Sequence, residues 1–109
     1  MEKVRNLTPH PIVVRSEGIE KVFPPSGVIP RVGTIETPAD PIEGIPTVTQ
    51  AMGTVEELPD AIPGVFLLVS AMVFNATDRR DVIAPDTGKG AIRDGQGRIL
   101  AVTRFIRKE

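Results

Sequence analysis

The segment from Asn75 to Arg98 contains the residue types of this chain best suited to chemistry. It combines basic side chains with two glycine-rich stretches, Gly88–Gly90 and Asp94–Gly97. Guanidinium groups beside loops with free backbone N–H groups suit the recognition of a phosphate-bearing small molecule. The alternative is a pair of solvated turns with surface ion pairs, each of which contributes little. The clustering of these residues favours a binding site.

The charge of the chain changes sign along its length. No lysine or arginine stands between Arg31 and Arg79, whereas acidic residues recur through the first part of this interval: Glu36, Asp40, Glu43, Glu56, Glu57 and Asp60. Residues 79–109 hold eight basic and four acidic residues, a net charge of +4. The formal net charge of the whole chain is only −1, which argues against binding to a nucleic-acid polymer.

Length and composition predict a single domain, residues 1–109, with an aliphatic core. The chain has 40% hydrophobic residues but only four phenylalanines and no tryptophan or tyrosine. A chain of 109 residues buries a smaller share of its surface than a larger domain does. We therefore expect a homo-oligomer, with Met52, Met72 and Phe74 as exposed apolar candidates for the interface.

Cysteine usage and hydropathy predict the compartment. The chain has no cysteine, residues 1–20 lack the apolar core of a signal peptide, and the apolar run Val65–Phe74 is too short to span a bilayer. We expect a cytoplasmic protein with no membrane partner.

Eleven prolines and ten glycines at short intervals favour short strands joined by tight turns. The fold class predicted is mainly β: a small, twisted, partly closed antiparallel sheet or barrel with one short α-helix. The apolar run Val65–Val69 predicts a buried central strand, and Ser70 can cap a helix over Ala71–Thr77 that packs through Met72, Val73 and Ala76.

Turn signals place the remaining elements. We expect a hairpin with a three-residue loop, Ser16–Gly18, whose glycine takes the left-handed conformation. A second hairpin, at the C-terminal end, is expected around Asp94–Gly97, and its last strand runs from Arg98 to Arg107. Arg104 would share a face of that strand with apolar residues and so needs a partner or a ligand. Further expectations are strands over Val28–Glu36, Ile45–Gln50 and Thr54–Leu58, and an exposed loop over Thr37–Gly44.

Three segments resemble known motifs but lack residues or spacing that those motifs require. Asp86-Thr87-Gly88 matches the aspartic-protease triplet, but only 23 residues follow Asp86, which leaves no room for the rest of that active site. Gly88-Lys89-Gly90 lacks the spacing and the hydroxyl residue of a phosphate loop, and Asp94–Gly97 lacks the alternating acids of a calcium loop. One histidine and no cysteine make zinc improbable, while a carboxylate site for magnesium stays open; we predict no metal and no cofactor.

His10, the one histidine, stands between two prolines that restrict its backbone. Two interpretations are open. The ring contributes to a phosphate site, either as a hydrogen-bond donor or as a general acid or base oriented by Asp86 in a phosphodiesterase. Otherwise it is a turn histidine bonded to a backbone carbonyl.

The opening Asn6-Leu7-Thr8-Pro9-His10-Pro11 resembles a family of small, mostly uncharacterised bacteriophage and prophage proteins that begin with Asn-Leu-Thr-Pro-His. The similarity extends over essentially the whole chain, through these segments: Pro25–Gly27, Arg31–Val32, Gly44–Pro46, Gly53–Leu58, Val69–Ala71, Arg79–Asp81, Pro85–Gly88 and Ala91–Asp94. Small phage proteins of this profile include inhibitors that sequester or cleave the nucleotide signals of bacterial defence systems such as Thoeris and CBASS. The resemblance implies an anti-defence protein.

We therefore expect a phage-encoded binding protein, not an enzyme, that sequesters a cyclic ADP-ribose isomer or a cyclic dinucleotide. The alternatives are a phosphodiesterase that uses His10 and Asp86, and a non-enzymatic structural or interaction protein of the virion. The predicted ligand-binding residues are His10, Ser26, Gly27, Arg31, Asn75, Arg79, Arg80, Asp86, Thr87, Gly88, Arg93 and Arg104. Among them, Arg79, Arg80 and Arg93 would pair with phosphates, and Arg104 would do the same or stack on a base. Asn75 and Asp86 would read polar edges of base or ribose, and Thr87 and Gly88 would offer hydroxyl and backbone donors. In an oligomer, the Pro25–Gly27 turn and Arg31 would complete the site from a neighbouring subunit.

Overall fold

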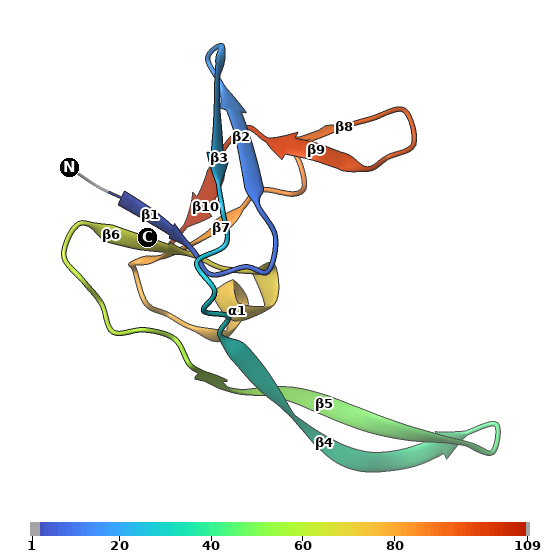
Figure 1. The fold of residues 1–109 in the computed structure, drawn as a ribbon. Helices are drawn as coiled ribbons and strands as arrows, with labels where there is room; N and C mark the ends of the chain where they lie inside the picture. The colour runs from blue at the N-terminus through green and yellow to red at the C-terminus, as the bar shows by residue number, and fades with distance from the viewer. Residues whose placement is uncertain (1–2, 109) are drawn as a thin grey trace.

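The computed structural model describes residues 3–108, which form ten β-strands and one short α-helix (Figure 1). The mainly β fold with one short helix is confirmed. In chain order the elements are β1 (Lys3–Asn6), β2 (Ile12–Ser16), β3 (Ile19–Phe23), β4 (Arg31–Ile42), β5 (Ile45–Glu56), β6 (Val65–Leu68), α1 (Ala71–Ala76), β7 (Val82–Pro85), β8 (Ala91–Arg93), β9 (Ile99–Val102) and β10 (Phe105–Arg107).

The strands form three twisted sheets that are not closed into a barrel. The strand orders are β1-β6-β7-β10, β3-β2-β9-β8 and β4-β5. Pairing is mixed: β6 runs parallel to both β1 and β7, and β2 runs parallel to β9. Parallel partners lie far apart in the chain and need no tight turn between them, so turn signals in the sequence do not reveal them.

The core lies around β6, as the apolar run Val65–Val69 predicts. Leu67, Leu68 and Val69 are at most 3% exposed because β6 is an inner strand and α1 follows it directly. Leu7, Val73 and Val82 complete this core. Because the chain has only four phenylalanines, the hydrophobic contribution to its stability comes mainly from burial of these aliphatic side chains.

Helix α1 begins where Ser70 predicts. The Ser70 side chain accepts a hydrogen bond from the Val73 backbone N–H at 3.3 Å, which satisfies one of the free donors of the first turn. Of the three predicted packing residues, Val73 is buried, Ala76 is half-buried and Met72 is 57% exposed. The helix therefore contacts the core mainly through Val73, with Phe74 partly buried against the same cluster.

Strands β2 and β3 form the first predicted hairpin. Ser16 pairs with Ile19, so the loop contains two residues, Glu17 and Gly18, at φ 51° and 77°, and the expected three-residue loop is wrong. Two consecutive residues with positive φ match the twist of the flanking strands.

The predicted C-terminal hairpin is present, but its long last strand is interrupted. β9 ends at Val102, and the chain turns at Thr103 and Arg104 into β10, which pairs with β7 in another sheet. A single strand over Arg98–Arg107 is therefore wrong. The interruption has a long-range cause, since residues 103 and 104 are bound by the segment that follows β7 (described below).

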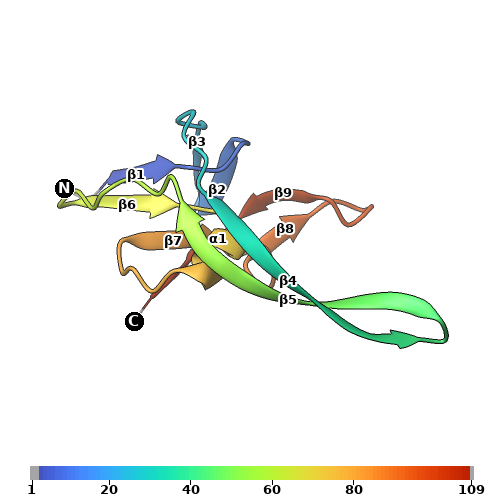
Figure 2. The ribbon, with the colours of Figure 1, turned by 90° about the horizontal axis from the view of Figure 1, so that it is seen from below.

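Strands β4 and β5 form a long hairpin, residues 31–56, that we call the arm (Figures 1 and 2). The loop expected over Thr37–Gly44 is wrong, since residues 37–42 extend β4 and only Glu43 and Gly44 make the turn, at φ 50° and 78°. The short strands expected at Ile45–Gln50 and Thr54–Leu58 are one continuous strand as far as Glu56. An isolated hairpin tolerates prolines because its outer edges face solvent and need no N–H donor.

The arm is anchored only at its base. Val32 and Val55 pack against the core cluster, together with Val28 and Leu58 on the flanking segments. At the base the two backbones approach closely: a Cβ on Gly53 would lie 3.0 Å from the carbonyl oxygen of Gly33. The absence of a Cβ at Gly53 therefore favours this close approach.

The molecule is elongated because the arm projects away from the other two sheets (Figures 1 and 2). Its radius of gyration is 16.8 Å, and its extents are 54 × 39 × 27 Å. A compact domain of this length has a radius of gyration of about 13 Å. No helix among residues 3–108 is long and apolar enough to cross a membrane.

Candidate functional site

The segment Asp86–Gly90, which we call the Asp86 loop, carries the chain from β7 in one sheet to β8 in another. Asp86 is 7% exposed. Its Oδ2 accepts a hydrogen bond from Arg104 Nε at 2.7 Å, and its Oδ1 accepts one from the Gly88 N–H at 3.0 Å. The Asp86 N–H also donates to the Arg104 carbonyl at 3.2 Å. Asp86 and Arg104 are thus joined through both backbone and side chains.

The far end of the Asp86 loop is fixed at Gly90. The Gly90 carbonyl accepts hydrogen bonds from the Thr103 N–H at 2.7 Å and the Thr103 hydroxyl at 2.8 Å. A Cβ at Gly90 would lie 2.9 Å from Asp86 Oδ2 and 3.0 Å from Arg104 Cγ. A side chain therefore does not fit there, and these bonds explain the interruption between β9 and β10.

The Asp86 carboxylate is stabilised in its charged form. The hydrogen bond from Arg104 is the largest cause that holds the pKa of Asp86 below its ordinary value, followed by the Gly88 backbone N–H, while burial opposes the shift. Asp86 is the partner that Arg104, an arginine beside apolar residues, was expected to need. The Arg104 side chain is nevertheless 61% exposed, and among the described residues its two terminal NH2 groups have no protein acceptor.

Arg93 connects the Asp86 loop to the turn that follows β8. It donates to the carbonyl of Thr87 at 2.9 Å and to that of Gly97 at 2.7 Å. Both acceptors are neutral, so the charge of Arg93 is not cancelled by its partners. Residues 86–104 hold four basic and two acidic side chains: Lys89, Arg93, Arg98 and Arg104 against Asp86 and Asp94. The loop is the centre of a net positive, partly exposed surface.

A cavity of about 110 Å³ lies beside the Asp86 loop. Its lining comes from three segments: Pro11–Val13, Pro85 with Thr87, and strand β9. Pockets that enclose a small-molecule ligand are typically about 300–1,000 Å³. This cavity can receive an edge of a ligand but cannot enclose a nucleotide.

Asn6 organises the turn that presents His10. Its side chain is buried and donates to the carbonyls of His10 at 2.8 Å and Phe23 at 2.7 Å. Its Oδ1 accepts bonds from the Thr8 N–H and hydroxyl. The His10 carbonyl is therefore fixed while the residue itself is exposed. The Asn6 carbonyl also accepts from the Ser26 N–H at 2.9 Å, which places Ser26 and Gly27 beside this turn.

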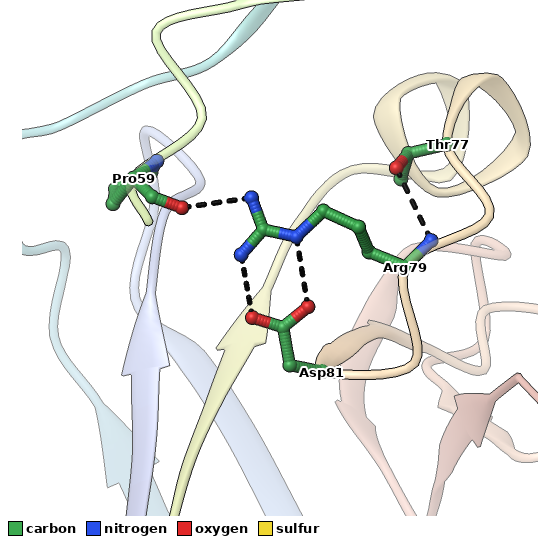
Figure 3. A network of polar contacts seen from close by, with 4 residues as sticks. All are labelled: Pro59, Thr77, Arg79 and Asp81. Atoms are coloured by element: carbon green, nitrogen blue, oxygen red, sulfur yellow. Dashed lines mark hydrogen bonds and ion pairs between the residues drawn. The ribbon is translucent and has the colours of Figure 1, made fainter. Parts of the chain in front are cut away.

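Arg79 is engaged in a different network (Figure 3). Its guanidinium binds both carboxylate oxygens of Asp81, at 3.0 and 2.6 Å, and the Pro59 carbonyl at 2.9 Å. The Asp81 hydrogen bond is the main cause of the raised pKa of Arg79. This network attaches the segment after β5 to the start of β7, so Arg79 performs a structural task.

The predicted site residues thus fall into separate groups. Asp86, Thr87, Gly88, Arg93 and Arg104 form one hydrogen-bonded group; His10, Ser26 and Gly27 are organised around Asn6, and the cavity between Pro11 and Thr87 adjoins both groups. Arg79 belongs to the Asp81 network, and Arg80 lines a groove described below. Arg31 and Asn75 are exposed and make no side-chain hydrogen bond within residues 3–108.

The sequence interpretation missed Asn6 and Asp81 as organising residues. Asn6 stands two residues before Thr8, the spacing of an Asx turn, which was an available signal. Asp81 stands two residues after Arg79, but only the fold makes that pairing bidentate.

Among residues 3–108 no hydrogen bond joins His10 to Asp86, whose carboxylate is bound by Gly88 and Arg104 instead, so His10 has no orienting carboxylate from Asp86. Among residues 3–108 no three His, Asp or Glu side chains are grouped so that they could hold a metal ion.

The fold and the site together define a small, elongated, mainly β protein with a fixed basic loop. A scan of protein-family models and searches of curated proteins and of solved structures found no match to this chain.

Proposed function

We propose that this protein binds a phosphate-containing nucleotide through the Asp86 loop. The observation that carries the proposal is the arrangement of Arg104, whose Nε is held by ionised Asp86 while its terminal NH2 groups face solvent. A guanidinium fixed at one edge and free at the other is preorganised for a bidentate bond to a phosphate. Little conformational entropy is then lost on binding.

The surroundings of Arg104 support the same ligand class. Lys89 is exposed on the loop, and Arg93 adds charge that its carbonyl partners do not cancel. The Thr87 hydroxyl is available as a donor or acceptor to ribose or phosphate. The adjoining cavity, with His10 next to its wall at Pro11, can take the edge of a base.

The biological part of the proposal is supported by the resemblance at Asn6–Pro11 and Pro85–Gly88. We propose a phage-encoded anti-defence protein of the host cytoplasm that sequesters a cyclic ADP-ribose isomer or a cyclic dinucleotide, as used in Thoeris or CBASS signalling. Sequestration is favoured over cleavage because Asp86 binds Arg104 and, among the described residues, no hydrogen bond joins it to His10, which therefore lacks the orienting group that a general base needs.

Calorimetry with cyclic dinucleotides and cyclic ADP-ribose isomers tests this proposal. We expect one class to bind, and Arg104→Ala to weaken binding about 10- to 100-fold, because a charge-assisted hydrogen bond contributes about 1.5–3 kcal/mol. Lys21→Ala is the control, since Lys21 is an exposed cation on β3 and should bind like the wild type. No heat with any of these compounds contradicts the proposal.

Chromatography separates sequestration from chemistry. After incubation with the protein, the nucleotide is released by heat and analysed. We expect it intact. Cleavage over many turnovers that is lost in His10→Ala would instead identify a phosphodiesterase.

A second candidate, a structural or interaction protein of the virion, is favoured by one observation. The arm exposes apolar side chains along most of its length, as protein-binding surfaces do. Detection of the protein in purified particles at a fixed copy number would support this candidate.

A further inference from the structure

The arm presents an unusual surface for a protein of this size. Beyond its base, every residue from Gly33 to Ile42 is exposed. The apolar residues Ile35, Ile42, Ile45, Val48 and Met52 are 48–67% exposed. By the pairing register, Ile35 lies on one face of the hairpin, while Val48 and Met52 lie on the other. The arm therefore buries neither face within its own chain.

A two-stranded hairpin without a third strand or a packing partner is marginally stable in water. Twelve residues in each strand make the arm about 40 Å long at about 3.3 Å per residue. Only its base is packed against the core. The length and exposure of the arm indicate that a partner covers its distal half.

The edges of the arm are not suited to strand addition. Pro38 and Pro41 in β4 and Pro46 in β5 have no N–H to donate to a further strand. Docking must therefore use the side chains of the faces and of the tip.

The charge of the arm indicates what kind of surface it can bind. Within the arm, residues 31–56, the four acidic residues are Glu36, Asp40, Glu43 and Glu56, and the single basic residue, Arg31, lies at the base. Two arms side by side would bring like charges together, which opposes association. The complementary surface must be basic and must also have an apolar floor for Ile42 and Ile45.

One groove of the molecule has these properties. It has a volume of about 470 Å³, and Ile62, Val65 and Phe66 contribute its apolar floor. Arg80 and Arg107 stand at its side, with the Arg107 guanidinium 5.1 Å from the centre of the Phe66 ring. The third charged residue of the groove, Asp81, is already paired with Arg79. The groove is thus positive and apolar.

The arm of a chain points away from its own groove. The groove lies at the start of β6, whereas the arm tip is at the opposite end of the molecule in both views (Figures 1 and 2). We infer that the arm tip, residues 40–45, docks into the groove of a second copy, where Ile42 and Ile45 cover the apolar floor and Asp40 and Glu43 face Arg80 and Arg107. This inference is independent of nucleotide binding.

A charge-swap experiment followed by light scattering tests the pairing. The wild type is expected to have a mass that is a multiple of the 11.7 kDa chain mass. Glu43→Arg and Arg80→Glu are each expected to weaken association at least about tenfold, because each places like charges in contact. The double variant E43R/R80E is expected to restore it. All these positions are exposed, and circular dichroism checks that each variant is folded.

The chain supplies matched controls. Glu17→Arg changes the glutamate of the β2–β3 turn, where Glu17 and Gly18 have nearly the same φ angles as Glu43 and Gly44, and Arg98→Glu reverses an exposed arginine outside the groove. Both are expected to associate like the wild type.

Three results would overturn the inference. They are a wild type that is monomeric at every concentration, single variants that associate as the wild type does, and a double variant that stays dissociated. Stronger association of Glu43→Arg would indicate arm-to-arm pairing and would also overturn it.

Discussion

At the scale of single residues, Asp86 should make the fold sensitive to acid. Its folded-state pKa lies below the ordinary value of 3.8, so its contribution to stability is complete above that pH and is lost as the pH falls through the lower folded-state value. Asp86→Asn should unfold at a lower temperature than the wild type at pH 7, and this difference should shrink towards pH 2. Melting curves across this pH range measure the difference. Asp78→Asn, an exposed position, should follow the wild type.

Gly90 should be intolerant of any side chain. Gly90→Ala places a methyl group within 3.0 Å of Asp86 and Arg104, and overpacking of this kind costs about 1–3 kcal/mol. Gly95→Ala is the matched control, because no atom lies within 4 Å of its Cβ position and its φ is not positive; we expect a change within about 0.5 kcal/mol. Chemical denaturation of both variants measures this. Equal stability of the two would contradict the packing around Asp86.

The roles of individual residues could be predicted from sequence only where the reason was local. The need of Arg104 for a partner followed from its position among apolar residues, but its partner Asp86 stands 18 residues earlier and no spacing rule joins them. Arg79 was predicted as a phosphate ligand, and the structure engages it with Asp81 and Pro59. Composition shows where cations gather, whereas their partners depend on tertiary contacts.

At the scale of elements, Asn6 connects three parts of the N-terminal region. Its amide makes four hydrogen bonds, to Thr8, His10 and Phe23, and it is 2% exposed. Asn6→Ala leaves several of these groups unpaired, so we expect a loss of about 2–4 kcal/mol in the free energy of unfolding. Asn75→Ala, an exposed asparagine of α1, should change it by no more than about 0.5 kcal/mol. Equilibrium unfolding of both variants decides this, and a neutral Asn6→Ala would contradict the assigned role.

The elements that the sequence predicted well are those with strong local signals. The run Val65–Val69 predicted the buried strand β6, and Ser70 predicted the start of α1. The arm was missed because Pro38, Pro41 and the acids around them favour a loop in most settings. They are tolerated in a strand here since both outer edges of the hairpin are free of ladder hydrogen bonds.

At the scale of the whole molecule, shape and charge are linked. The acidic arm extends away from the two sheets that carry the basic residues, so each copy presents both an acidic apolar tip and a basic apolar groove. The groove shares no lining residue with the Asp86 loop, so the two surfaces are separate. Variants that dissociate the assembly should therefore bind nucleotide as the wild type does, which calorimetry on Glu43→Arg can measure.

The most direct test of the central claim is a titration of isotope-labelled protein with the cyclic nucleotides, followed by NMR. The account predicts saturable shifts for one nucleotide class, concentrated at the amides of Gly88, Gly90, Arg93 and Thr103, and their loss in Arg104→Ala. Because these amides belong to the fixed loop or its partners, shifts there would place the ligand against the exposed edge of Arg104. No shift with any nucleotide, or shifts confined to residues away from the Asp86 loop, would contradict it.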